Sequence, residues 1–194
     1  MSGTFIVLEG PDGSGTTTLS RMLAEKLISD GKEAVLTKEP TDGVYGKKLR
    51  EDLSNKNRMP PKDFQKIFCD DRAEHLESIV NPALNDGKFV VSDRYYHSTF
   101  IYGSAEGVPM EELEEMNKEF PAPGLTIFAL PPFEVCKERI HKRESRDAYE
   151  QDDFMRKVYE GYKKYSDEHQ DIVVVDTSKS PEENIDEIVH HLNS

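Results

Sequence analysis

Residues 8–20 read LEGPDGSGTTTLS and join a short apolar run to a segment with helical spacing. Gly10 and Gly15 are separated by four residues, and three threonines follow. Apart from its lysine, this is the spacing of the phosphate-binding loop G-x-x-x-x-G-K-[ST]. Glycines let backbone N–H groups approach phosphate oxygens closely, and the helix N-terminus that follows favours anions. The stretch therefore predicts a phosphate-binding loop, or P-loop, over residues 9–17.

The lysine position of this loop holds Thr16. In the motif the lysine reaches the β and γ phosphates, and the next hydroxyl, here that of Thr17, binds Mg²⁺. The alternative interpretation is a glycine-rich turn between a strand and a helix, with ordinary Ser/Thr capping. On this motif alone, both interpretations stay open.

Composition and charge limit the classes of partner. The chain of 194 residues suits one domain, 1–194, and its formal net charge of −13 argues against nucleic acid as a partner, because phosphate backbones are bound through clustered Lys and Arg. The N-terminal MSGTFIVLEG has neither a basic lead nor a long apolar run, so we expect a cytoplasmic protein with no membrane partner. Cys69 and Cys136 lack metal-ligand spacing and are expected to be reduced packing residues.

Five short apolar runs alternate with segments of helical spacing. The runs are TFIVLE (4–9), EAVLT (33–37), KFVVSD (88–93), LTIFAL (125–130) and DIVVVD (171–176). Continuous apolar runs of this kind are typical of strands that are buried on both faces. Strands alternating with helices predict a parallel α/β sheet, whose ligands bind outside the carboxyl ends of the strands.

A second candidate segment, VSDRYYHSTFIYG, covers residues 91–103 and places Asp93 and Arg94 at the end of a predicted strand. A P-loop enzyme positions a metal-associated carboxylate and a phosphate-binding guanidinium at such a strand end. A local salt bridge is the alternative.

A third segment, residues 67–87, puts Phe68 and Arg72 one helical turn apart and so on one face of a helix. An aromatic ring beside a guanidinium suits a nucleobase that stacks on the ring and pairs through its polar edge or phosphate. Ordinary amphipathic packing is the alternative.

Taken together, these segments resemble the thymidylate kinase family from about residue 3 to the C-terminal helix. The resemblance lies in LEGPDGSGTTT, TKEPT, FCDDRAEH, NPALNDGKFVVSDRYYHST and LTIFALPPFEVCKERI. It implies Mg²⁺-dependent transfer of the γ-phosphoryl group of ATP to the 5′-phosphate of dTMP, giving dTDP. It also implies a P-loop fold of five parallel strands flanked by helices, with a short mobile lid, and a homodimer, which is common among the family's members.

The resemblance assigns roles to three groups of residues. Those implied to bind ATP are Gly10, Pro11, Asp12, Gly13, Ser14, Gly15, Thr16, Thr17 and Thr18. Those implied to bind the acceptor are Asp12, Lys38, Glu39, Pro40, Arg50, Phe68, Arg72, Arg94, Ser98, Thr99 and Tyr102. Thr17 and Asp93 are implied to hold the Mg²⁺ ion, and Tyr102 to discriminate against a ribose hydroxyl. For Arg50 the alternative is a solvated charge on a helix.

Three positions depart from the family pattern. Thr16 replaces the lysine, and Leu130 and Gly124 stand where members often carry aspartate. The first departure matters most, because losing one preorganised cation costs about 10² to 10³ in the rate of phosphoryl transfer.

A lid over residues 141–150 offers a substitute for the missing charge. Family members whose P-loop lacks an extra basic residue tend to carry lid arginines, and this segment contains Arg143 and Arg146. We expect Arg143 or Arg146 to supply catalytic charge when the lid closes over ATP, with Arg94 assisting. Asp12 is expected to orient the reactants, because the phosphate of dTMP is already a nucleophile at neutral pH.

Two alternatives to a dTMP kinase stay open on the sequence. One is a non-catalytic or regulatory P-loop protein that binds a nucleotide without turning it over. The other is a kinase for another pyrimidine deoxynucleotide, such as dUMP.

Overall fold

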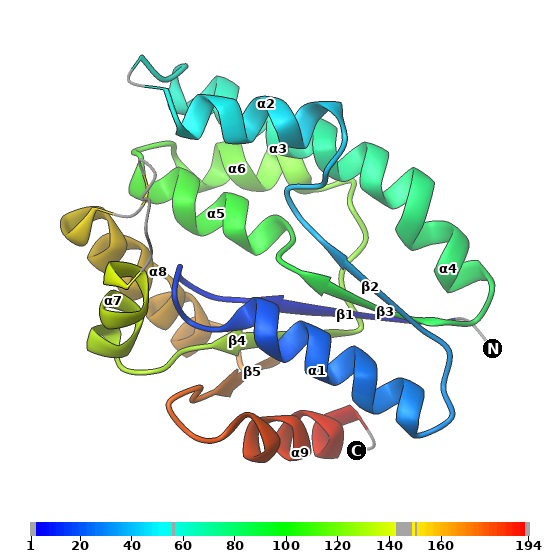
Figure 1. Ribbon diagram of the computed structural model, residues 1–194. Coiled ribbons are helices and arrows are strands. Elements are labelled where there is room, and N and C mark those ends of the chain that lie inside the picture. Colours follow the sequence, from blue (N-terminus) through cyan, green and yellow to red (C-terminus); the bar gives the residue numbers. More distant parts are fainter. Residues whose placement is uncertain (1–2, 56, 143–148, 150, 193–194) are drawn as a thin grey trace.

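Five parallel strands form the sheet at the centre of the molecule, in the order β2-β3-β1-β4-β5 (Figure 1). The computed structural model describes residues 3–55, 57–142, 149 and 151–192. The strands are β1 (Thr4–Glu9), β2 (Ala34–Lys38), β3 (Phe89–Asp93), β4 (Leu125–Ala129) and β5 (Ile172–Val175). Each strand end lies within one residue of its predicted position, so the expected parallel α/β sheet is confirmed.

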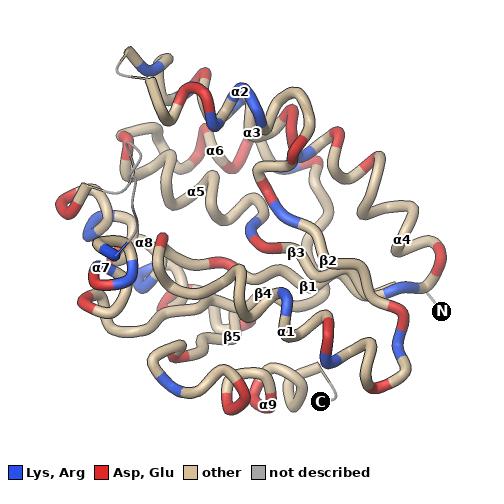
Figure 2. The backbone as a smooth tube through the Cα atoms, in the orientation of Figure 1, with Lys and Arg blue, Asp and Glu red and all other residues tan. Residues whose placement is uncertain are grey.

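Helices cover both faces of this sheet (Figure 1). One face carries α1 (Thr16–Ser29) and α9 (Pro181–Leu192). The other carries α3 (Pro61–His75), the π-helical turn η1 (Leu76–Val80), α4 (Asn81–Asn85), α5 (Tyr96–Ala105) and α8 (Asp152–Glu168). Farther out, α2 (Val44–Leu53), α6 (Met110–Asn117) and α7 (Phe133–His141) pack on α3, α5 and α8 respectively. The acidic residues are spread over both helical layers (Figure 2).

The side chains of β1 alternate between two hydrophobic cores. Ile6 and Leu8 pack beneath α1 and α9, whereas Phe5 and Val7 face η1 and α4. Because β1 pairs with β3 on one side and with β4 on the other, all four side chains are buried. The continuous apolar run in the sequence reflects this burial on both faces.

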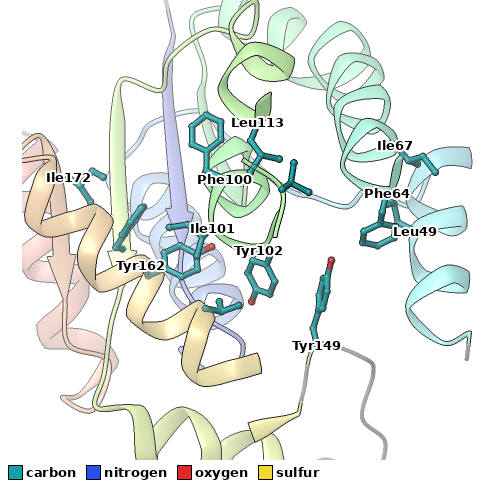
Figure 3. Close-up of a cluster of buried hydrophobic side chains, with 13 residues drawn as sticks. Leu49, Phe64, Ile67, Phe100, Ile101, Tyr102, Leu113, Tyr149, Tyr162 and Ile172 are labelled. Atoms are coloured by element: carbon teal, nitrogen blue, oxygen red, sulfur yellow. The ribbon is translucent and has the colours of Figure 1, made fainter. Parts of the chain in front are cut away.

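Helix α5 was not predicted as a helix from the sequence. It directly follows β3 and passes between α3 and α8, which bury six of its ten residues. A helix covered on nearly every side has no polar face, and so its sequence lacks the apolar periodicity that identifies surface helices. Figure 3 shows this region, where Tyr102 of α5 lies beside Tyr149 and Tyr162.

The carboxyl ends of β1, β2 and β3 are held side by side. The backbone N–H of Glu39 donates to the carbonyl of Asp93 at 2.9 Å, and that of Arg94 donates to the carbonyl of Leu8 at 2.8 Å. The polar residues that follow these three strands are thereby gathered at one edge of the sheet. Among the helices that the structure describes, none is both long and apolar enough to cross a lipid bilayer.

A buried histidine lies beneath this edge. The ring of His97 is 5% exposed and packs edge-on against Phe128 and Tyr165, and its Nδ1 atom has no hydrogen-bond partner among the described residues. Burial, aided by the charges of Arg72 and His169, lowers the pKa of His97 to about 3. The folded protein therefore holds this imidazole neutral.

We expect acid to destabilise the protein through His97. Between pH 6.5 and about 3, the unfolded chain binds a proton at this position that the folded chain excludes, so stability falls as the pH is lowered. The contribution reaches at most about 1.4 kcal/mol per pH unit. Urea unfolding of wild type and His97→Leu across this range measures it as a difference in slope, with the exposed His191→Leu as control. Equal slopes in wild type and His97→Leu would contradict the assignment.

Candidate active site

The loop between β1 and α1 has the conformation that a phosphate-binding loop requires. Gly13 and Gly15 have φ angles of 79° and 98°, in the left-handed region that favours glycine. A Cβ atom on Gly13 would also lie 2.5 Å from the carbonyl oxygen of Cys136. Above the loop is a cavity of about 270 Å³, here called the P-loop cavity, lined by Pro11, Asp12, Gly13, Gly15, Thr16, Thr17, Thr18, Arg94 and Arg139.

Thr17 and Asp93 meet beside this loop, as the sequence predicted for a metal pair. The Thr17 hydroxyl donates to Oδ2 of Asp93 at 2.5 Å. The Oδ1 atom of Asp93 is buried and has no hydrogen-bond partner within the described part of the chain. A hydroxyl, a carboxylate and two phosphate oxygens are the hard oxygen ligands that Mg²⁺ prefers. In the same part of the chain no three His, Cys, Asp or Glu side chains lie together as a group that could hold a metal ion.

Arg94 links the end of β3 to the P-loop. Its guanidinium donates to the Gly10 carbonyl at 2.9 Å, to Asp12 at 2.6 Å and to Ser98 at 3.1 Å. Although desolvation opposes its charge, Tyr102 and Asp12 raise the pKa of Arg94 well above its ordinary value. The backbone of Arg94 has a φ of 76°, an uncommon conformation for a residue with a side chain and one that is found at functional sites.

A second cavity of about 550 Å³, here called the acceptor cavity, opens on the other side of Arg94. It is lined by Asp12, Thr17, Lys38, Glu39, Pro40, Arg50, Leu53, Gln65, Phe68, Asp93, Arg94, Ser98, Thr99, Tyr102 and Tyr149. The structure thus brings together all the residues that the sequence analysis assigned to the acceptor, with the exception of Arg72. Their individual roles stay predictions.

Arg72 lies behind the wall of the acceptor cavity and is 1% exposed. Its Nε and Nη2 atoms bind Glu39 at 3.0 and 2.8 Å, and its guanidinium also donates to Thr99 and Asn117. Glu39 also contacts Nδ1 of His75 at 3.0 Å. In this arrangement the guanidinium orients the two cavity-lining residues Glu39 and Thr99.

The sequence analysis missed Glu9, a buried carboxylate at the end of β1. It accepts hydrogen bonds from the backbone N–H groups of Tyr95 and Ser98, at 2.8 and 3.0 Å, and from the hydroxyls of Ser98 and Tyr162, at 2.6 and 2.8 Å. Burial raises the pKa of Glu9, and these donors together with Arg94 oppose the shift. Glu9 thereby fixes the start of α5 against β1. A charged residue at the end of an apolar strand was the available signal.

Arg139 of α7 was missed as well. Its guanidinium donates to the carbonyls of Gly13 and Ser14, at 3.1 and 3.2 Å, and to the carbonyl of Thr177 at 2.8 Å. It therefore ties the P-loop to the segment after β5. This arginine lies in the stretch LTIFALPPFEVCKERI, but nothing in that stretch shows its role, because its partners are backbone carbonyls far away in the sequence.

The predicted lid arginines, Arg143 and Arg146, lie outside the described residues. At the far end of the same segment, Tyr149 is 5% exposed and returns to the body of the molecule. Its hydroxyl donates to Glu106 at 2.8 Å, and Nη1 of Arg58 donates to the same carboxylate at 2.7 Å. The ring of Tyr149 lies between Tyr102 of α5 and Phe64 of α3 (Figure 3).

Comparison with known proteins agrees with this geometry. A family model described as "Thymidylate kinase" matches residues 8–188. The chain is 38% identical over 184 residues to a "Probable thymidylate kinase" of Archaeoglobus fulgidus, covering 94% of this chain and 91% of that protein. It is 36% identical over 195 residues to a "Probable thymidylate kinase" of Pyrococcus horikoshii, with coverage of 97% and 95%. It is also 36% identical over 158 residues to a "Thymidylate kinase" of Desulfotalea psychrophila, with coverage of 80% and 78%. The chain belongs to the thymidylate kinase family.

Proposed function

We propose that this protein is a dTMP kinase, which transfers the γ-phosphoryl group of ATP to the 5′-phosphate of dTMP and releases dTDP and ADP. One observation carries the proposal: Asp12, Thr17 and Arg94 line both the P-loop cavity and the acceptor cavity. A donor phosphate over the loop and an acceptor phosphate in the second cavity therefore meet at these three side chains. Direct transfer between two bound nucleotides needs such a shared wall.

The donor nucleotide fits along α1. A cavity of about 250 Å³ adjoins the P-loop cavity, shares Gly15, Thr18 and Arg139 with it, and is also lined by Leu19, Thr177, Lys179, Pro181 and Asn184. We place the base of ATP in this cavity, because the planar guanidinium of Arg139 offers a face on which a ring can stack. The phosphates then lie over the P-loop and the N-terminus of α1.

The transfer step depends mainly on positioning and charge. Thr17 and Asp93 would hold the Mg²⁺ ion, which would neutralise charge on the β and γ phosphates. The acceptor phosphate is already a nucleophile at neutral pH, so no side chain has to remove a proton. Asp12 is held at 2.6 Å from Arg94 and orients that guanidinium between the two phosphates. Arg143 and Arg146 supply the charge that Thr16 lacks.

The alternatives make different demands on the site. A protein that only binds a nucleotide needs the P-loop but has no need of the acceptor cavity with Phe68 and Tyr102. A dUMP kinase needs the same cavity, because uracil differs from thymine by one methyl group. The homodimer implied by the resemblance and the cytoplasmic location expected from the N-terminal sequence stay predictions.

A coupled ADP-release assay with ATP and Mg²⁺ tests the proposal, run with dTMP, dUMP, dCMP and no acceptor. We expect turnover that depends on dTMP. Because other cations supply the missing charge, Thr16→Lys should change kcat by less than about tenfold, well below the ~10² to 10³ assigned to one stabilising donor. Ser29→Lys, at the exposed end of α1, controls for the added charge. A silent wild type that Thr16→Lys revives would favour the nucleotide-binding alternative.

The Arg139→Ala variant tests the placement of the donor. Losing a guanidinium that braces Gly13 and Ser14 should raise the KM for ATP about tenfold, because hydrogen bonds to a charged group are worth about 1.5 to 3 kcal/mol each. The KM for dTMP should stay unchanged. Arg21→Ala removes an exposed arginine that pairs with Glu25 and serves as the matched control. An equal rise in both KM values would contradict the placement.

The Arg143→Ala and Arg146→Ala variants test the compensation for Thr16. At least one should lower kcat about 10²- to 10³-fold at saturating ATP, as the removal of a transition-state donor does. Lys142→Ala, which removes an exposed lysine paired with Glu138 at 2.6 Å, is the control. Unchanged turnover in the double variant would refute the lid as the source of the charge.

A further inference from the structure

Three residues of the acceptor cavity carry buried oxygen atoms without a hydrogen-bond partner among the described residues. They are Asp93, Tyr102 and Gln65. The Asp93 oxygen lies at the metal pair with Thr17, and the Tyr102 hydroxyl lies beside Arg94 and Asp12. Both therefore belong to the phosphate end of the cavity. Gln65, on α3, has no function in the phosphoryl transfer described above.

Gln65 lines the same cavity as Phe68. The two residues are three positions apart on α3, so they share one face of the helix. Gln65 lines the acceptor cavity and is 0% exposed. A flat ring that stacks on Phe68 would present its edge to the Gln65 carboxamide.

Glu106, at the end of α5, sets which way the carboxamide points. Nε2 of Gln65 donates to Oε2 of Glu106 at 3.4 Å, and Arg58 donates to Oε1 of the same carboxylate at 2.7 Å. A carboxylate paired with arginine only accepts hydrogen bonds, so it attracts the NH₂ group of Gln65. The Oε1 atom of Gln65 is thus left as an acceptor without a donor.

The hydrogen-bond acceptors of the neighbouring residues Glu39 and Thr99 already have partners. Both oxygens of Glu39 are bound, one by Arg72 and the other by His75. The Thr99 hydroxyl accepts from Arg72 at 3.3 Å, which leaves it a proton to donate. A base that has a hydrogen-bond donor on its edge therefore finds its free acceptor at Gln65.

On the basis of the proposed function, we propose that Gln65 determines the base specificity of the acceptor site. Its Oε1 atom accepts a hydrogen bond from N3–H of thymine or uracil. Cytosine has no hydrogen on N3 and would set a lone pair against this oxygen. The enzyme therefore accepts imide pyrimidines and rejects cytosine, and Glu106 is the positioning residue that keeps the oxygen of Gln65 turned to the base.

The same carboxylate also binds the hydroxyl of Tyr149, the described residue at the end of the lid segment. The Glu106 carboxylate therefore accepts both the hydrogen bond that orients Gln65 and the hydrogen bond from Tyr149. A change at Glu106 alters both, whereas a change at Gln65 alters only the contact with the base.

Steady-state kinetics with dTMP, dUMP and dCMP test this proposal. In Gln65→Leu, kcat/KM for dTMP and dUMP should fall about ten- to hundredfold, the effect of leaving one buried donor unpaired, mainly through KM. The value for dCMP should stay the same or rise. Gln65→Met, which keeps the length of the side chain, should show the same changes in kcat/KM as Gln65→Leu. Lys66→Met, at the exposed neighbouring position, is the matched control.

Glu106→Gln tests the positioning role separately. A glutamine at 106 can donate to Oε1 of Gln65, so the carboxamide can turn over and offer its NH₂ group to the base. The ratio of kcat/KM for dTMP to that for dCMP should then fall, while kcat with dTMP falls less. Glu111→Gln, on the exposed face of α6, is the control.

The outcomes separate the two proposals. A wild type without dTMP-dependent turnover refutes the proposed function. An active wild type whose dTMP-to-dCMP ratio is unchanged in folded Gln65→Leu or Gln65→Met refutes the role of Gln65. If neither variant folds, two other measurements test the role of Gln65. They are the dTMP-to-dCMP ratio of kcat/KM in Glu106→Gln and the affinities of wild type for dTMP and N3-methyl-dTMP. Equal affinity for these two nucleotides would overturn the assignment.

Discussion

The arrangement of the site depends on the partly buried side chain of Arg94. It leaves the central region of the sheet at the end of β3, crosses to the P-loop and bonds to Gly10, Asp12 and Ser98. A charge that is largely removed from water must be paired; two of the partners, Gly10 and Asp12, belong to the loop after β1, and the third, Ser98, belongs to α5. The loop, the strand ends and the helix are therefore fixed relative to one another by the needs of one guanidinium. The phosphate chemistry uses the side of that guanidinium which its partners leave open.

Further buried charges extend this framework in both directions. Glu9 holds the first turn of α5 to β1, and Arg72 holds Glu39 against Thr99. Each carboxylate or guanidinium is satisfied by several groups, which is the condition under which buried polar networks specify a single arrangement. The two cavities are consequently walled by side chains whose rotamers are set by partners behind them. Preorganised walls of this kind position substrates without a large change on binding.

The sequence predicted the parts of the fold that local patterns encode. The five apolar runs became the five strands, because burial on both faces leaves a continuous signature. Helix α5 has no polar face, so its sequence shows no periodic pattern that would identify it as a helix. The spacing of the glycines identified the P-loop, but Arg139 and Glu9 were missed because their partners lie far away along the chain. Arg72 was placed on the correct helical face, yet only the structure shows that Glu39 and Thr99 stand between it and the cavity.

The position of β1 gives the two halves of the site different local stabilities. β1 has a hydrogen-bonded neighbour on each side, so its amide hydrogens exchange with solvent only when the centre of the sheet opens. β2 stands at the end of the sheet order and has β3 as its neighbour, so smaller openings release its amides. The P-loop follows the strand that opens last, whereas Lys38 ends, and Glu39 follows, a strand that opens sooner. Local opening of the folded state therefore disturbs the acceptor side of the site before it disturbs the P-loop, which binds the donor phosphates.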